Sequence, residues 1–290
     1  MSSIQQPGPV KVALFQMTSG IDPLANAAAI AAAAHEAVES GAGMIFTPEM
    51  CGLLDRDRAR ASRHIVAEAD NPVLARARQS ARDLKIWIDL GSLAILRDDG
   101  KWANRGFVID SDGEIAARYD KVHMFDVDLA TGETWRESAA YTPGDRVVAV
   151  DTPIGLLGMA ICYDVRFPAL FEELGRLRCD AIRIPAAFTV PTGKAHWHLL
   201  QRARAIEASA WVISAAQGGS HDDGRQTYGH SLIVTPWGEI LAEAGDAPGV
   251  ITATLDLNRI TQARTMVPAL THDRHFTLTN MTKNTEILDK

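Results

Sequence analysis

Short apolar runs alternate with segments of helical periodicity along most of the chain. Residues 10–16 form an apolar run that predicts a strand. Asp22 and Pro23 then supply an N-cap and a first-turn proline, and apolar residues recur at helical spacing as far as Val38. Gly41 ends this helix, and residues 44–46 are again short and apolar. A strand, a helix and a second strand in this order are typical of an α/β fold.

The same unit recurs towards the C-terminus. Further helices are predicted over residues 72–84, 167–178 and 196–210, with a short one from Leu257. Further strands are predicted over residues 86–90, 102–109, 114–119, 147–150, 156–161, 181–184, 211–216, 230–234, 240–243 and 250–255. Because hairpin turns such as Asp112-Gly113 accompany the strand–helix units, we expect a mixed sheet. One α/β domain over residues 1–290, with a polar tail from about residue 277, accounts for this pattern.

The composition limits the classes of protein to which the chain can belong. Its 290 residues are 47% hydrophobic, which is enough for a sizeable core. A net charge of -7 without any basic run argues against a nucleic-acid partner. Three cysteines are too few for a disulfide framework and fit a reducing compartment. Since the start lacks a signal-peptide segment and no apolar run is long enough to span a membrane, we expect a cytoplasmic protein with no membrane partner.

Three chemically different side chains come shortly after predicted strands: Glu49, Lys121 and Cys162. A carboxylate can take a thiol proton as general base, an ammonium group can stabilise an oxyanion, and a thiolate can attack an acyl carbon. Each residue alone also has a structural interpretation, as a loop or capping glutamate, a surface lysine or a small core cysteine. Their similar placement favours a shared catalytic site.

The segments around these residues resemble the three signatures of the nitrilase superfamily of carbon–nitrogen hydrolases. They are residues 47–49 (TPE), 119–126 (YDKVHMFD) and 161–168 (ICYDVRFP), in the order and rough spacing of the family. The resemblance extends over most of the chain. It implies a four-layer αββα sandwich that pairs into an eight-layered homodimer, which often assembles further. It also implies a reaction without cofactor or metal, carried by Glu49, Lys121 and Cys162.

The resemblance also points to residues beside these three. Glu137 matches a second glutamate of the family, which would hydrogen-bond Lys121; the alternative is a solvated loop glutamate. The backbone N–H of Tyr163 is a candidate second donor to the oxyanion. Arg166 can receive a substrate carboxylate, or it can form a structural ion pair with a loop acid.

Later segments resemble the Nit branch of the superfamily. They are residues 185–189, 192–197, 202–207 and 228–238. This resemblance implies an amidase for a small, anionic oxo-acid amide, and it places Phe188 and Thr189 among the substrate-binding residues. Within this branch the chain resembles the deaminated glutathione amidases, and ω-amidases acting on 2-oxoglutaramate are the alternative. Nitrilase and N-carbamoyl hydrolase activities use the same three catalytic residues and stay open.

Other chemistries have less support in the sequence. His196 and His198 are two apart on a predicted helix, so they point to different sides and do not form a zinc site by themselves. The chain contains no phosphate-binding loop, dinucleotide-binding glycine pattern or nucleophilic serine motif. A redox-sensing thiol or a catalytically inactive binding scaffold is the alternative from a different class.

Overall fold

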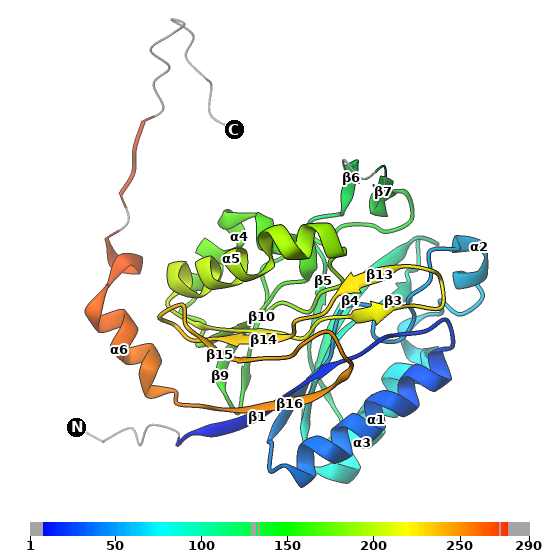
Figure 1. Ribbon diagram of the computed structural model, residues 1–290, viewed down its shortest axis with the longest axis horizontal. Helices are drawn as coiled ribbons and strands as arrows, with labels where there is room; N and C mark the ends of the chain where they lie inside the picture. The colour runs from blue at the N-terminus through cyan, green and yellow to red at the C-terminus, as the bar shows by residue number, and fades with distance from the viewer. Residues whose placement is uncertain (1–7, 129–131, 133, 273, 278–290) are drawn as a thin grey trace, which may run out of the picture.

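Two β-sheets lie face to face in the middle of the molecule, and helices cover both outer surfaces (Figure 1). The structure, a computed structural model, describes residues 8–128, 132, 134–272 and 274–277. The polar tail that the sequence predicts therefore lies almost entirely outside the described residues. The four layers confirm the predicted αββα sandwich.

The first sheet has six strands in the order β16-β1-β2-β3-β4-β5. In that order they are Gly249–Leu255, Val10–Gln16, Met44–Phe46, Trp87–Leu96, Trp102–Ile109 and Ile115–Asp120. Strands β1, β2 and β3 run parallel, whereas β16, β4 and β5 each pair antiparallel with a neighbour.

The second sheet has six strands in the order β15-β14-β11-β10-β9-β8. They are Ile240–Glu243, Leu232–Val234, Trp211–Ser214, Ala181–Arg183, Gly155–Met159 and Ala149–Thr152. Here β9, β10 and β11 form the parallel centre, flanked by antiparallel pairs. Two small hairpins lie outside the sheets: β6 (Asp126–Asp128) with β7 (Thr134–Arg136), and β12 (Gly218–Ser220) with β13 (Gln226–Tyr228).

Helices α1 (Pro23–Glu39) and α3 (Pro72–Leu84) cover the first sheet, and α4 (Pro168–Arg176) and α5 (Val190–Ala208) cover the second (Figure 1). The side chains of Asp22 and Asn71 accept hydrogen bonds from backbone N–H groups in the first turns of α1 and α3. These caps satisfy donors that have no partner inside a helix. The short helix α2 spans Arg58–Ala61, and α6 (Asn258–Met266) follows the last strand.

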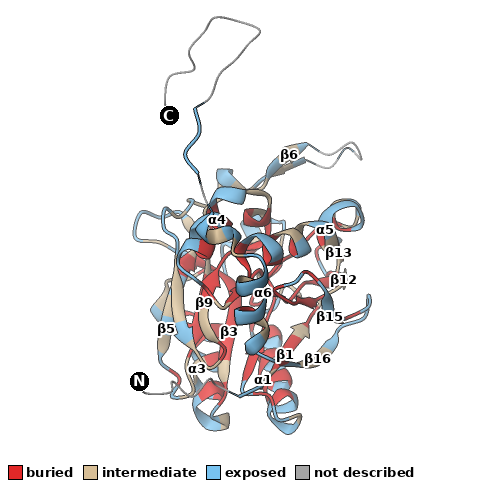
Figure 2. Cartoon of the chain, turned by 90° about the vertical axis from the view of Figure 1, so that its left-hand side faces the viewer, coloured by how far each residue is buried: buried red, intermediate tan, exposed pale blue. Residues whose placement is uncertain are grey.

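Burial follows the alternation of side chains along the strands. Val12 and Leu14 of β1 point into the cluster between the two sheets, whereas Ala13 packs under α1 and α3. Because successive side chains of a strand point to opposite faces of the sheet, β1 contributes to the core between the two sheets and to the core under the helices. Figure 2 shows the result: the central strands of the two sheets are mostly buried, and the exposed residues lie mainly on the helices and loops.

Several element boundaries differ from those predicted, and two of the differences have a clear physical reason. Helix α5 begins at Val190 instead of residue 196, because Pro191 occupies its first turn, where the missing N–H costs nothing. Strand β14 begins at Leu232 instead of residue 230, because His230 adopts a left-handed backbone (φ 57°) that a strand cannot contain.

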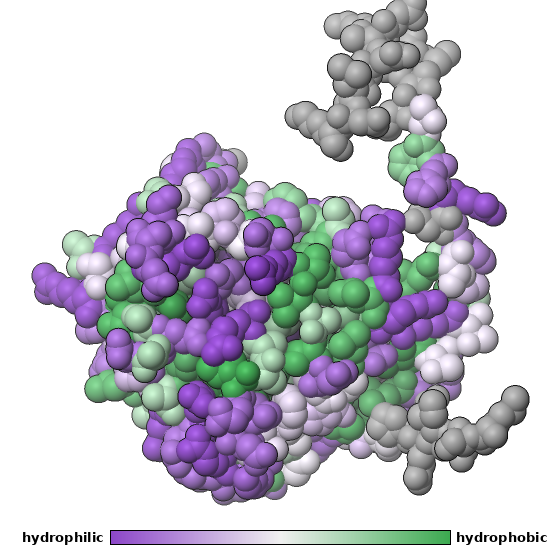
Figure 3. All heavy atoms as spheres, turned by 180° about the vertical axis from the view of Figure 1, so that it is seen from behind, coloured by the Kyte–Doolittle hydropathy of each residue, from purple (hydrophilic) through white to green (hydrophobic). Residues whose placement is uncertain are grey.

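Apolar and polar residues are unevenly distributed over the face opposite to that of Figure 1. Apolar residues gather across its middle, with polar residues above and below them (Figure 3). Among the helices of the described residues, none combines the length and the apolar character needed to cross a bilayer.

Candidate active site

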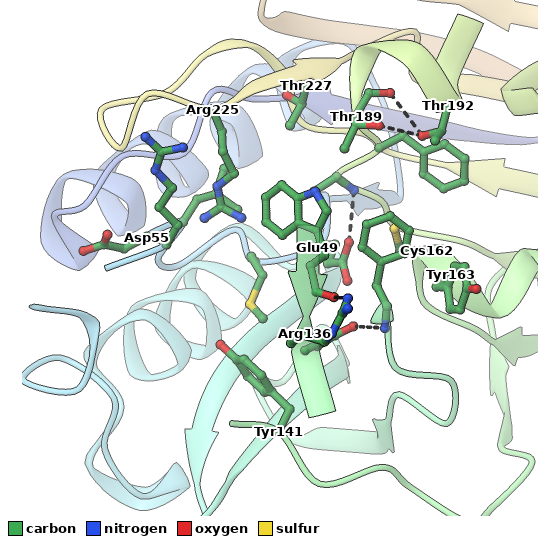
Figure 4. Close-up of a pocket in the computed structure, with 18 of the residues that line it drawn as sticks. Glu49, Asp55, Arg136, Tyr141, Cys162, Tyr163, Thr189, Thr192, Arg225 and Thr227 are labelled. Carbon is green, nitrogen blue, oxygen red and sulfur yellow. Dashed lines mark hydrogen bonds between the residues drawn. The ribbon is translucent and has the colours of Figure 1, made fainter. Parts of the chain in front are cut away.

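Glu49, Lys121, Glu137 and Cys162 all line one pocket of about 940 Å³. Glu49 lies just after β2 and Lys121 just after β5, both in the first sheet, whereas Cys162 lies just after β9 in the second. Glu137 begins a short 3₁₀ helix, Glu137–Ala139, that follows the β6–β7 hairpin. Figure 4 shows Glu49, Cys162 and Tyr163 close together in the pocket. The structure thus brings together the residues that the sequence singled out.

Lys121 is the centre of the charged cluster. Its Nζ donates to Glu49 Oε1 at 2.9 Å and to Glu137 Oε1 and Oε2 at 3.1 and 2.9 Å. Lys121 and Glu49 are both buried, with only 2% and 5% of their surfaces exposed. Buried charges are tolerated when they are paired and hydrogen-bonded, as here. Glu137 is therefore a partner of the lysine and not a solvated loop glutamate.

Two further groups fix Glu49, and the sequence analysis missed both. The Asn104 side chain, from β4, donates to Glu49 Oε1 at 2.9 Å and to Glu137 Oε1 at 3.1 Å. The Ala187 backbone N–H donates to Glu49 Oε2 at 3.0 Å. The signal that could have revealed Asn104 was a buried polar side chain in a strand that is largely apolar. No sequence signal marks the Ala187 N–H, because its role depends on where the backbone passes.

Cys162 has an unusual backbone conformation for a residue with a side chain. Its φ is 48°, in the left-handed region, and it opens the 3₁₀ helix Cys162–Arg166 directly after the strand. Such strain persists only where the surroundings impose it. Buried Asp164 provides that constraint. Its carboxylate accepts hydrogen bonds from the Ile161 N–H at 2.9 Å, the Tyr119 hydroxyl at 2.7 Å and the His123 N–H at 3.0 Å.

The electrostatics keep the nucleophile neutral at rest. Burial raises the pKa of the Cys162 thiol well above its usual range, the charge of Glu49 raises it further, and Lys121 opposes this only in part. Burial disfavours the charged form of Lys121, but the carboxylates of Glu137 and Glu49 outweigh burial and hold its pKa high. The site therefore holds a protonated thiol beside a carboxylate and an ammonium group. This is a suitable starting point for base-assisted attack.

The four predicted substrate-binding residues, Tyr163, Arg166, Phe188 and Thr189, all line the same pocket. The Arg166 guanidinium lies 5.9 Å from the Tyr163 ring centroid and 5.5 Å from that of Phe188, and its Nη1 is 3.3 Å from His196 Nδ1. Within the described part of the chain, Arg166 forms no ion pair with an acid. Its positive charge is thus free to meet an anionic group in the pocket.

The other two cysteines are packing residues. Cys51 follows Glu49 by two positions, but its thiol is fully buried and donates to the Ser92 carbonyl at 3.4 Å. Burial raises the pKa of Cys51 to about 12 and that of Cys179 to about 11. Neither residue lines the pocket, and both lack the partners that surround Cys162.

Gly91 on β3 controls how closely that strand approaches the segment before Glu49. A Cβ at this position would lie 2.1 Å from the Thr47 carbonyl oxygen and 2.4 Å from that of Pro48. We expect Gly91→Ala to displace this backbone, to lower stability by about 2–4 kcal/mol and to lower activity at least tenfold. Urea unfolding and steady-state kinetics measure the two effects. Gly43→Ala is the control, because a Cβ there meets no atom within 4 Å; equal behaviour of the two variants would contradict the expectation.

Comparison with known proteins places this site in a family. The family model for carbon–nitrogen hydrolases matches residues 11–265. The deaminated glutathione amidase of Yersinia enterocolitica is 38% identical over 266 residues, which is 91% of this chain and 92% of the relative.

Solved structures give the same result. The Caenorhabditis elegans NitFhit protein superimposes with a TM-score of 0.85 at 36% identity, over 92% of this chain and 65% of that longer chain. A glutamate-to-glutamine mutant of an amidase from Nesterenkonia sp. AN1 superimposes with a TM-score of 0.74 at 26% identity, over 89% of this chain and 98% of that chain. That structure shows acrylamide added covalently to the amidase's active-site cysteine. The resemblance seen in the sequence is confirmed.

Proposed function

The chain belongs to the carbon–nitrogen hydrolase family, and we propose that it is an amidase that cleaves a small oxo-acid amide of the deaminated glutathione type. The observation that carries the proposal is the position of Lys121, which bridges Glu49 and Glu137 on the wall of the pocket that Cys162 enters. The similarity to deaminated glutathione amidases supports the substrate class.

In the first half of the proposed reaction, Glu49 takes the proton of the Cys162 thiol while the sulfur attacks the amide carbon. The carbonyl oxygen becomes an oxyanion, which the Lys121 ammonium group and the Tyr163 backbone N–H stabilise. Protonated Glu49 then passes its proton to the amide nitrogen, the C–N bond breaks, and an amine leaves. A thioester on Cys162 remains.

In the second half, water replaces the amine. Glu49 takes a proton from water, the hydroxide equivalent attacks the thioester carbon, and the C–S bond breaks. The acid product leaves and the thiol regains its proton, so the site returns to its initial state. Glu137 touches neither substrate nor sulfur in this scheme; it positions Lys121 and keeps it charged. No step of the scheme calls for a cofactor.

The shape and charge of the pocket support a substrate larger than a simple amide. A volume of about 940 Å³ is near the upper end of the usual range for ligand pockets. It has room for an oxo-acid acyl group together with a dipeptide-like amine. Arg166, which has no acidic partner among the described residues, is proposed to bind a carboxylate of the acyl group.

A substrate panel tests this proposal. We expect deaminated glutathione to give the highest kcat/KM, 2-oxoglutaramate a lower value, and benzonitrile negligible turnover. Arg166→Gln is expected to raise KM for both anionic amides about tenfold or more, because a charge-assisted contact is lost. Preferential turnover of benzonitrile, or an unchanged KM in the Arg166 variant, would contradict the proposal.

We further propose a cytoplasmic homodimer or higher homo-oligomer. Its support, besides the family, is a set of large apolar side chains left exposed on α5 and α6, namely Leu199, Ile206 and Met266 at 70%, 53% and 61%. Association of two copies over these side chains would remove their apolar surface from water. Light scattering after size exclusion is expected to give at least twice the chain mass of 31.4 kDa, and a monomer at micromolar concentration would refute the proposal.

A further inference from the structure

A second cluster of titratable side chains lies outside the pocket. It consists of His198 on α5, His230 just before β14 and Glu243 at the end of β15. One ligand atom from each residue lies within 4.8 Å of the other two. None of the three lines the pocket of Cys162. In Figure 1, α5 crosses above β14 and β15.

The two imidazoles converge on one oxygen atom. His198 Nε2 is 2.7 Å and His230 Nδ1 is 2.8 Å from Glu243 Oε1. The carboxyl group of Glu243 is thus flanked by two imidazole nitrogens.

The opposite side of the His230 ring also faces a carboxylate. His230 Nε2 is 3.1 Å from Asp246 Oδ1. In the tautomer that carries its proton on Nε2, the lone pair of Nδ1 is directed at Glu243 and is available to a cation. A carboxylate behind a ligating imidazole is the usual way in which proteins orient a metal-binding histidine.

The His230 position is held firmly. Its backbone has a left-handed φ of 57°, which is uncommon for residues other than glycine. Its carbonyl accepts a hydrogen bond from Trp197 Nε1 at 2.8 Å, and its ring stacks on Tyr228 with centroids 4.3 Å apart. This backbone conformation directs the imidazole towards Glu243, and Trp197 of α5, the helix that carries His198, holds the His230 backbone through its hydrogen bond. Strain of this kind is concentrated at functional sites.

We propose that His198, His230 and Glu243 bind a divalent transition-metal ion, with Zn²⁺ as the preferred probe. Two imidazoles and one carboxylate are a common ligand set for Zn²⁺, with bonds of about 2.0–2.2 Å. Such bonds place tetrahedral ligands about 3.3 Å apart. Each nitrogen would therefore move about half an ångström away from Glu243 Oε1, and all three ligand atoms already lie within 4.8 Å of one another. Side-chain exposures of 33%, 23% and 31% leave room for a water molecule as the fourth ligand.

The proposed ion has a structural role and takes no part in amide hydrolysis. It would join α5 to the segment that runs from β13 to β15. Both elements also contribute to the pocket, through Thr192 on α5 and Thr227 on β13. Metal binding would thus hold α5 and the segment from β13 to β15 together, and so hold in place the pocket wall to which Thr192 and Thr227 belong.

The test is calorimetric titration of the full chain, freed of metal by chelator and dialysis, with Zn²⁺. We expect saturable binding of one ion per chain, weakened at least about tenfold in His198→Ala and in Glu243→Gln, and about tenfold in Asp246→Asn. His35→Ala is the control, because His35 is an exposed histidine on α1 and lies in the opposite layer. A saturating concentration of Zn²⁺ is expected to raise the melting temperature of the wild type by about 5 °C and that of the two ligand variants far less.

Circular dichroism shows whether each variant folds, and Glu243→Gln preserves the size and hydrogen-bonding capacity of the side chain if His198→Ala does not fold. Failure of the wild type to bind, or equal binding by the wild type and both ligand variants, would overturn the metal site. Because the readouts are binding and thermal stability, the outcome is independent of amide turnover. Failure of the proposed amidase activity would be seen separately in the substrate panel.

Discussion

Replacement of Cys162 by alanine is expected to lower amide turnover by about 10⁴-fold or more and to leave the fold intact. The change removes the only atom in the site that can form the thioester, and neither Glu49 nor Lys121 can replace it as a nucleophile. The side chain is small and lies at the pocket surface, so the loss of packing is modest. Steady-state kinetics and urea unfolding measure the two effects.

Cys179→Ala is the matched control for this experiment. Cys179 is fully buried under α4, where its Sγ packs against the segment around Gly158. This substitution is expected to cost about 1 kcal/mol of stability and to leave kcat unchanged. Substantial hydrolysis by the Cys162 variant would contradict the nucleophile assignment. A binding function that is sensitive to peroxide, with no turnover of any amide, would favour the redox-sensing alternative instead.

Glu49→Gln is expected to lower kcat by about 10³-fold while making Cys162 easier to alkylate near neutral pH. Glutamine keeps the shape of the side chain and can still accept from Lys121, but it cannot take the thiol proton. The rate of amide hydrolysis therefore falls. The charge of Glu49 is one of the causes that raise the Cys162 pKa. Removing that charge lowers the pKa, so thiolate forms at lower pH in the variant.

The pH dependence of alkylation by iodoacetamide separates this effect from simple disruption of the site. In the wild type, the rate is expected to keep rising above pH 9, because the thiol pKa is raised. In Glu49→Gln the same curve shifts towards lower pH. Glu36→Gln, at an exposed position on α1, is the control and should match the wild type in both assays. An unchanged alkylation profile together with normal turnover in Glu49→Gln would show that Glu49 is not the base.

The sequence by itself determined the strands of the two sheets and the longer helices, but it predicted neither α2 nor the two small hairpins outside the sheets. Local periodicity reports which face of an element is buried, and this information is contained within a few neighbouring residues. Strands β1 and β4 have the predicted bounds. The three signature segments, each placed after a strand, were also sufficient to identify the family. The chemistry of Glu49, Lys121 and Cys162 follows from their residue types.

Only the tertiary structure decided how these residues meet. Asn104 and the Ala187 N–H orient Glu49 because β4 and the segment after β10 pass beside it, although they are 55 and 138 positions away in the chain. The sequence shows His198 two positions from His196 on a helix, whereas its partners His230 and Glu243 lie more than thirty positions later in the chain. Distances between remote positions depend on strand order and register. Those are set by the packing of whole sheets, which no local pattern contains.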